Sequence, residues 1–199
     1  MKKVVLGSAS PRRKELLEQI GITFDIKTSS KEECYTSVIP EKIVKELALQ
    51  KAENVAEEII HNEGCIKDTV VIGADTIVAL DHEILGKPKD EEDAFRMIFN
   101  LQGRAHQVFT GTALLIYDEN GKKYIVNHAV ETKVYVNRMS DEEIRNYIAS
   151  KEPMDKAGAY GIQGGFAAYI DRIEGDYYNV VGLPVSYLYQ ELKKAEAIS

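Results

Sequence analysis

The hydrophobic positions along the chain alternate between runs typical of buried strands and spacings typical of amphipathic helices. Apolar and β-branched runs predict strands over residues 3–7, 23–28 and 68–80, and two long strands over residues 106–118 and 123–136. Glu119-Asn120-Gly121, between the two long strands, is a hairpin signal. Strands that alternate with helices indicate an α/β architecture, here rich in sheet.

Helix signals fill the remaining stretches. The first helix is expected over residues 11–20, because Ser10 suits an N-cap, Pro11 suits the first helical position and Gly21 is a stop signal. Further helices are expected over residues 41–60, 90–103, 140–149 and 183–195. The fourth helix begins with a capping box formed by Ser140 and Glu143.

Lys51 interrupts the apolar side of the helix expected over residues 41–60. That side is formed by Ile43, Val44, Leu47, Ala48, Val55 and Ile59. A lysine in such a stripe can lay its stem along the edge of the core and keep its ammonium in water. It can also point into a polar cleft, and the motifs described below favour this second interpretation.

Composition narrows the class of protein. The chain has 199 residues, 44% hydrophobic and 29% charged, which suits one large domain or two small lobes, and we expect a single domain over residues 1–199. The net charge of −7 argues against a general nucleic-acid or membrane-surface binder, so any anionic ligand must meet a local basic cluster. Cys34 and Cys65 lack metal-binding spacing and indicate free thiols in a reducing compartment. With no signal-peptide pattern and no long apolar run, a cytoplasmic location is expected.

The stretch SASPRR, residues 8–13, places two arginines in the first turn of the first helix. A helix N-terminus presents free N–H groups and partial positive charge to anions, and basic residues there oppose the helix dipole. An anion that bridges Arg12 and Arg13 to the helix end explains both features. The alternative is a solvated pair of arginines, with Ser8 and Ser10 serving only as turn formers and caps.

Asp75 follows a buried run, residues 70–74, and is expected at or near the end of that strand. Strand ends are where α/β sheets bind ligands, although a core or turn aspartate is the plainer alternative. Together with Glu32 or Glu33, Asp75 could bind Mg²⁺ or Mn²⁺ through oxygen ligands.

Two later motifs add candidate ligand-binding groups. GKP, residues 86–88, sets Lys87 in a tight turn, where a lone lysine is ordinarily a surface residue. In the glycine-rich stretch DKAGAYGIQG, residues 155–164, the amide of Gln163 matches the O4 and N3–H edge of uracil or thymine. The chain has no P-loop, no G-x-G-x-x-G and no G-x-S-x-G, which disfavours the kinases, dehydrogenases and hydrolases that use them.

In this order along the chain, SASPRR, GADT, GKP, KAGAYGIQG and NVVGLP resemble the Maf family of nucleotide pyrophosphatases. The resemblance covers essentially the whole chain. It implies an α/β fold similar to the inosine-triphosphate pyrophosphatases, with a central mixed twisted sheet, flanking helices and a cleft between two lobes. The implied reaction converts a nucleoside triphosphate and water to the monophosphate and pyrophosphate, with a divalent metal.

The resemblance also assigns roles to individual residues. Asp75 matches the proton acceptor, and Arg12, Thr76 and Gln163 match positions tied to substrate choice. The segment AYGIQG resembles the branch of the family that acts on dTTP and UTP. Family members are further linked to septum formation, to cleansing of modified pyrimidine nucleotides from the pool and to homodimers.

Residue chemistry and resemblance together predict one site. The expected substrate-binding residues are Ser8, Arg12, Arg13, Lys51, Thr76 and Gln163; the catalytic residues are Asp75 and Lys87; and the metal ligands are Asp75 and Glu33, the latter slightly favoured over Glu32. Two other functions stay open: a nucleotide-binding regulator of cell division with negligible catalysis, and a metal-dependent phosphatase that releases orthophosphate from phosphomonoesters.

Overall fold

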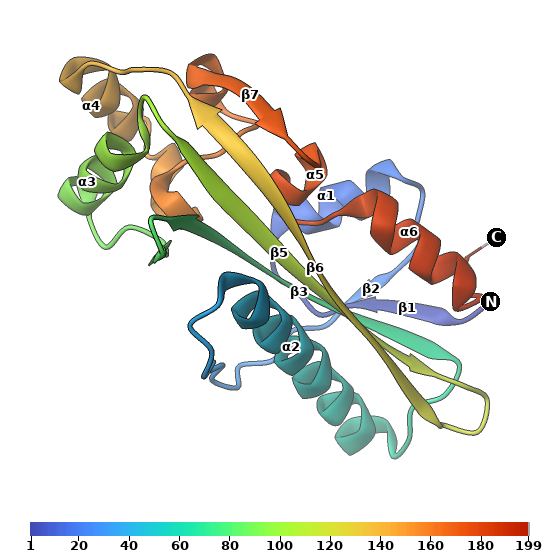
Figure 1. The fold of residues 1–199 in the computed structure, drawn as a ribbon. Coiled ribbons are helices and arrows are strands. Elements are labelled where there is room, and N and C mark those ends of the chain that lie inside the picture. Colours follow the sequence, from blue (N-terminus) through green and yellow to red (C-terminus); the bar gives the residue numbers. More distant parts are fainter. Residues whose placement is uncertain (199) are drawn as a thin grey trace. The chain divides into compact units, whose positions relative to one another are not determined.

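The computed structural model describes residues 1–198, which form a mixed α/β fold (Figure 1). The strands are joined in the order β2-β1-β3-β5-β6-β7, and β4 pairs with β3 beside this path. The strands are β1 (Lys3–Leu6), β2 (Asp25–Ile26), β3 (Thr69–Leu80), β4 (Glu83–Leu85), β5 (Ala105–Tyr117), β6 (Lys123–Val136) and β7 (Ile170–Glu174). The helices are α1 (Pro11–Gln19), α2 (Pro40–Glu63), α3 (Glu91–Leu101), α4 (Asp141–Ala149), α5 (Tyr177–Val181) and α6 (Val185–Lys194), with 3-10 turns η1 (Glu152–Asp155), η2 (Ala157–Ala159) and η3 (Gly165–Tyr169).

Internal contacts divide the chain into two compact units. Unit 1 comprises Met1–Asp75, Thr110–Val130 and the chain from Gly182 onward, and unit 2 comprises Thr76–Phe109 and Glu131–Val181. The boundaries fall inside β3, β5 and β6, so each of these strands contributes residues to both units.

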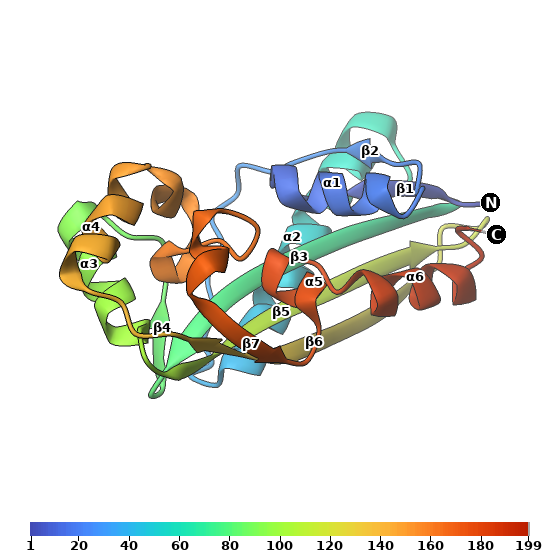
Figure 2. The same cartoon turned by 90° about the horizontal axis from the view of Figure 1, so that it is seen from above.

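In unit 1, the short strand β1 lies between two parallel neighbours. Val5 pairs with Asp25 of β2 and with Val71 of β3. Helix α2 covers one face of these strands, and α1 and α6 lie on the other face (Figures 1 and 2). The core on the α2 side contains Val5, Ala48, Ala52, Val55, Ile59, Val71 and Leu115. This burial explains why β1 and β3 are continuous apolar runs rather than alternating ones.

Two glycines allow α2 to approach the strands of unit 1 closely. A Cβ on Gly73 would lie 2.1 Å from the carbonyl oxygen of Ala48, and a Cβ on Gly111 would lie 2.1 Å from that of Val44. Both distances are far inside van der Waals contact, so a larger residue would push the helix away from the sheet. Gly73 therefore sets the height of α2 over β3, two residues before Asp75.

In unit 2, β4 folds back antiparallel onto β3 through a tight turn at Asp81 and His82, whose φ angles are +49° and +70°. Strand β7 pairs antiparallel with β6 at the other side of the unit. Helices α3 and α4 pack on each other (Figure 1). The core of the unit includes Val78, Ile98, Leu101, Val134, Ile144, Tyr160 and Phe166.

Most predicted elements are confirmed. The strands expected over residues 3–7, 68–80, 106–118 and 123–136 are β1, β3, β5 and β6, and the expected helices are α1, α2, α3, α4 and α6. The capping box is formed, since the Ser140 N–H donates to Glu143 Oε2 at 2.8 Å. Cys34 and Cys65 are exposed free thiols.

One strand was predicted too long, and some short elements were not predicted. The strand predicted over residues 23–28 is only Asp25–Ile26, because its parallel partner β1 ends at Leu6. Helix α5 and turn η1 were not predicted, since both are too short to show a helical period. Among residues 1–198, no helix combines the length and the apolar character that crossing a membrane requires.

Candidate active site

Asp75 lies just past the point where the neighbouring strand β1 ends. Leu6, the last residue of β1, pairs with Ile72, and the Gly7 N–H donates to the Ile72 carbonyl at 2.7 Å. The prediction that Asp75 lies at or near the end of its own strand was wrong, because β3 continues to Leu80 beside β5 and β4. The carboxylate still lies beyond the carboxyl end of β1, which is the side where parallel strands bind ligands.

Lys51 projects from α2 toward two carboxylates. Its Nζ lies 2.5 Å from Asp75 Oδ1 and 2.9 Å from Glu33 Oε2. The side chains of Lys51, Asp75 and Glu33 are 21%, 17% and 28% exposed, so these contacts are partly shielded from water. Shielding strengthens such ion pairs relative to those on an open surface. The structure thus directs the lysine of the apolar stripe into a polar cluster.

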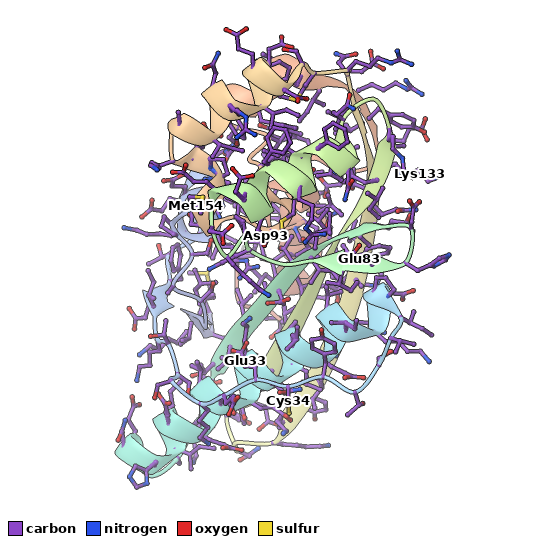
Figure 3. The ribbon with its side chains drawn as sticks, turned by 90° about the vertical axis from the view of Figure 1, so that its left-hand side faces the viewer. Glu33, Cys34, Glu83, Asp93, Lys133 and Met154 are labelled. Carbon is purple, nitrogen blue, oxygen red and sulfur yellow. The ribbon has the colours of Figure 1, made fainter. Side chains whose placement is uncertain are left out.

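The loop that carries Glu33 is fastened along α2 (Figure 3). The Cys34 N–H donates to Gln50 Oε1 at 3.1 Å, and Gln50 Nε2 donates to the Cys34 carbonyl at 2.5 Å. Glu33 then reaches Lys51, whereas Glu32 is exposed. The sequence left open which of the two glutamates belongs to the site. Glu33 is the one that contacts the same Lys51 ammonium as Asp75 does.

Arg13 is buried at the base of α1, with 9% of its surface exposed. Its Nε donates to the Gly182 carbonyl at 2.9 Å, and its Nη1 donates to Ser8 Oγ at 3.0 Å. Ser8 Oγ also accepts from the Ser10 N–H at 3.3 Å, which shapes the turn before α1. The second arginine of SASPRR therefore ties the N-terminal loop to the segment that precedes α6.

The side chains of the candidate site in unit 1 carry a net positive charge. Arg12, Arg13 and Lys51 supply three positive charges against the two negative charges of Glu33 and Asp75. Burial lowers the pKa of Arg13, and the charges of Asp75 and Glu33 oppose that shift. An arginine stays protonated under these conditions. Because the first turn of α1 contains no acidic residue, its N-terminus adds further attraction for an anion.

The carboxylates of Asp75 and Glu33 fit a divalent cation. Both contact the ammonium of Lys51, so the side chains already share one positive charge. Their oxygens are the donors that Mg²⁺ prefers, and an ion bound by one or two carboxylates completes its shell with water and phosphate oxygens. In the described part of the chain, no group of three or more His, Cys, Asp and Glu side chains could hold a metal ion. Two carboxylates leave the other positions around such an ion to water and phosphate oxygens.

The remaining predicted residues belong to unit 2. Thr76, the first residue of unit 2, is partly buried. Lys87 is exposed after β4, and the neighbouring Gly86 carbonyl accepts from the Gly158 N–H at 3.0 Å. This bond joins the GKP turn to the glycine-rich stretch. Gln163 is exposed in the turn between η2 and η3.

Two residues of the unit 1 site escaped sequence reasoning. Gln50 precedes Lys51, but a polar residue on a helix surface carries no local signal for the bond it makes. Gly182 belongs to the motif NVVGLP, yet its carbonyl contacts an arginine 169 positions away. Only the folded chain brings that pair together.

Comparison with known proteins gives the class of this chain. A model of the family described as Maf-like protein matches residues 3–195. A dTTP/UTP pyrophosphatase of Lachnoclostridium phytofermentans is 48% identical over 194 residues, which cover 98% of this chain and 95% of that protein. A dTTP/UTP pyrophosphatase of Agathobacter rectalis is 50% identical over 200 residues, or 98% of each chain. The chain belongs to the Maf family.

Among solved structures, the Ham1 protein of Staphylococcus aureus is similar over 97% of this chain and 99% of that chain, with 13% identity and a TM-score of 0.47. So distant a likeness carries no conclusion about chemistry. The mixed α/β fold rests on the strands and helices described above.

Proposed function

We propose that the protein is a nucleoside triphosphate pyrophosphatase that converts dTTP and UTP to the monophosphate and pyrophosphate. The observation that carries the proposal is the cluster of unit 1, where Lys51 joins Asp75 to Glu33 within electrostatic reach of buried Arg13. The curated relatives support the choice of substrate, since proteins 48% and 50% identical over nearly their full lengths are named dTTP/UTP pyrophosphatase.

The basic residues of unit 1 bind the triphosphate in this proposal. Arg12 and the N–H groups at the start of α1 donate to phosphate oxygens. Arg13 adds charge from a fixed position, because Ser8 and Gly182 hold two of its donor groups. Such positioning and charge stabilisation supply most of the catalysis in phosphoryl chemistry.

Asp75 is the proposed general base. A water oxygen forms a bond to the α-phosphorus, and the bond from that phosphorus to the oxygen bridging to the β-phosphate breaks. The water proton passes to the Asp75 carboxylate, and the electron pair of the broken bond leaves with pyrophosphate. The 2.5 Å contact with Lys51 Nζ orients the carboxylate for this transfer. No covalent enzyme intermediate is needed.

Glu33 and Asp75 are the proposed ligands of a divalent cation, Mg²⁺ or Mn²⁺. When bound, such a cation neutralises charge on phosphate oxygens and on the leaving pyrophosphate. Gln50 holds the backbone next to Glu33, so the glutamate presents its carboxylate from a fixed loop. Lys51 keeps the two carboxylates facing the same point.

Three residues of unit 2 complete the proposal. Gln163 reads the base: its amide nitrogen donates to O4 and its amide oxygen accepts from N3–H of uracil or thymine. That edge is unchanged by a substituent at C5, so 5-modified pyrimidine triphosphates are expected substrates as well. Thr76 contributes to substrate choice, and Lys87 stabilises negative charge on the phosphates.

The test is to identify the products formed from a panel of nucleoside triphosphates with Mg²⁺ or Mn²⁺. Pyrophosphate and monophosphate in equal amounts, from dTTP and UTP ahead of CTP and the purine nucleotides, are expected. Release of orthophosphate in place of pyrophosphate would instead indicate a phosphatase. Nucleotide binding without turnover would contradict the proposed catalysis and favour a nucleotide-binding regulator of cell division.

A further inference from the structure

Part of the glycine-rich stretch of unit 2 closes around a single carboxylate. Glu152, in η1, accepts from the Tyr147 hydroxyl at 2.9 Å through Oε1 and from the Gly165 N–H at 3.0 Å through Oε2. The Tyr147 hydroxyl in turn accepts from the Gly161 N–H at 3.3 Å. The segment Gly161–Gly165, which we call the recognition loop, is thus tied to the Glu152–Tyr147 pair at both ends.

Gly164 gives independent evidence for this arrangement. A Cβ at this position would lie 2.0 Å from Glu152 Oε1 and 2.5 Å from Oε2. The carboxylate therefore occupies the space that any side chain at position 164 would need. Glycine at position 164 thus allows the loop to lie directly against the Glu152 carboxylate.

The surroundings keep both partners in place. Burial, followed by the hydrogen bond to Glu152, raises the pKa of Tyr147, so its hydroxyl remains a donor across the physiological range. The Tyr147 ring packs on Phe166, with centroids 5.2 Å apart. Lys156 Nζ donates to the Glu152 backbone carbonyl at 2.6 Å, which fixes the turn that carries the glutamate.

We propose that Glu152 and Tyr147 are positioning residues for pyrimidine recognition, because they hold the recognition loop in the shape that presents Gln163. The inference rests on the proposed function, in which Gln163 reads the base. Gln163 is exposed and lies midway between the two tied glycines, so its direction depends on the backbone around it. An amide held in one orientation discriminates uracil from cytosine, whereas an amide on a loosened loop can turn to suit either edge.

The experiment compares Glu152→Gln and Tyr147→Phe with a matched control, Glu174→Gln, which changes an exposed carboxylate of β7 that lies 3.8 Å from Arg172. Steady-state constants are measured for UTP, dTTP and CTP. Since a charge-assisted hydrogen bond is lost, the ratio of kcat/KM for UTP to that for CTP is expected to fall about tenfold in both loop variants, mainly through KM. The control keeps the wild-type ratio.

Amide hydrogen exchange provides a readout that does not depend on turnover. The Gly161 and Gly165 amides are expected to exchange faster in Glu152→Gln and Tyr147→Phe than in the wild type and in Glu174→Gln. Equal loss of activity on all three nucleotides, with an unchanged UTP to CTP ratio, would overturn the inference. If the wild type itself shows no preference for UTP, the proposed function is rejected instead, and the exchange rates alone decide whether Glu152 and Tyr147 hold the loop.

Discussion

Both groups of the Gln50 side-chain amide bond to the backbone of Cys34. The amide oxygen accepts from the Cys34 N–H at 3.1 Å, and the amide nitrogen donates to the Cys34 carbonyl at 2.5 Å. Glu33 precedes that cysteine, and Lys51 follows that glutamine. One side chain therefore aligns the Glu33 carboxylate with the ammonium that lies 2.9 Å from it.

Replacing Gln50 is expected to weaken metal binding. In Gln50→Ala the loop loses both bonds to α2, so Glu33 no longer faces Asp75 from a fixed position. Loss of such a supporting contact typically lowers metal affinity about tenfold or more. Titration of the protein with Mn²⁺ in the presence of a non-hydrolysable dTTP analogue, followed by electron paramagnetic resonance, measures this effect.

The matched control for that titration is Gln190→Ala, which truncates an exposed glutamine of α6. Its Mn²⁺ affinity should equal that of the wild type. Equal affinity in Gln50→Ala would show that the loop holds Glu33 without help from α2.

Asp75→Asn is expected to abolish turnover while preserving nucleotide binding. The amide cannot take the proton of the attacking water, and loss of a general base typically lowers kcat at least about a hundredfold. Pyrophosphate release from dTTP measures catalysis, and fluorescence titration with a labelled nucleotide measures binding. Asp81→Asn, an exposed carboxylate paired with Arg104 at 2.6 Å, is the control. Turnover retained in Asp75→Asn rules out this carboxylate as the base.

Gly73→Ala is expected to destabilise the protein and to impair activity together. The new methyl would lie 2.1 Å from the Ala48 carbonyl oxygen and 2.8 Å from the Ala52 nitrogen, so α2 must move away from β3. Overpacking of this kind costs about 1–3 kcal/mol of unfolding free energy. The same movement draws Lys51 away from Asp75. Urea unfolding reports the first effect and dTTP hydrolysis the second.

The control for Gly73→Ala is Gly86→Ala, where an added Cβ meets no heavy atom within 4 Å. Its unfolding free energy should stay close to the wild-type value. A stable and fully active Gly73→Ala variant would contradict the role assigned to the close approach of α2.

His106 is expected to make stability depend on pH in a defined window. Burial lowers its pKa from 6.5 to about 4, and its Nε2 lies 2.7 Å from the Tyr160 hydroxyl. Between these two values the unfolded chain binds a proton that the folded protein does not. Stability therefore falls as the pH drops from about 6.5 to about 4, by about 3 kcal/mol in all from this group.

Urea midpoints measured across that pH range test the expectation. His106→Gln, which cannot titrate there, should show a shallower decline than the wild type. His61→Gln changes an exposed histidine of α2 and should keep the wild-type slope. Parallel curves for His106→Gln and wild type would assign the acid sensitivity to other groups.

Local patterns predicted the elements and some of the site. Lys51 drew attention because it interrupts an apolar stripe, and the fold directs it to Asp75 and Glu33. Helical spacing and capping residues determine structure within one or two turns, so the order of neighbouring residues is enough to predict them.

Contacts between distant segments could not be predicted in this way. Arg13 was predicted as a substrate-binding residue, and no local pattern indicated that the fold buries it against the Gly182 carbonyl. No local pattern indicated that the group nearest to the missing side chain of Gly164 is the Glu152 carboxylate. Both facts depend on tertiary packing, which no local period encodes.

The Glu152 contacts have a consequence for how substrate preference can change. Tyr147, Gly161 and Gly165, which bond to Glu152 or to each other, lie with it in one short continuous stretch of chain. The element proposed to read the base therefore carries its own scaffold in adjacent sequence. A substitution within residues 147–165 can therefore change the recognition loop together with its support, while Lys51, Asp75 and Glu33 lie in other segments of the chain.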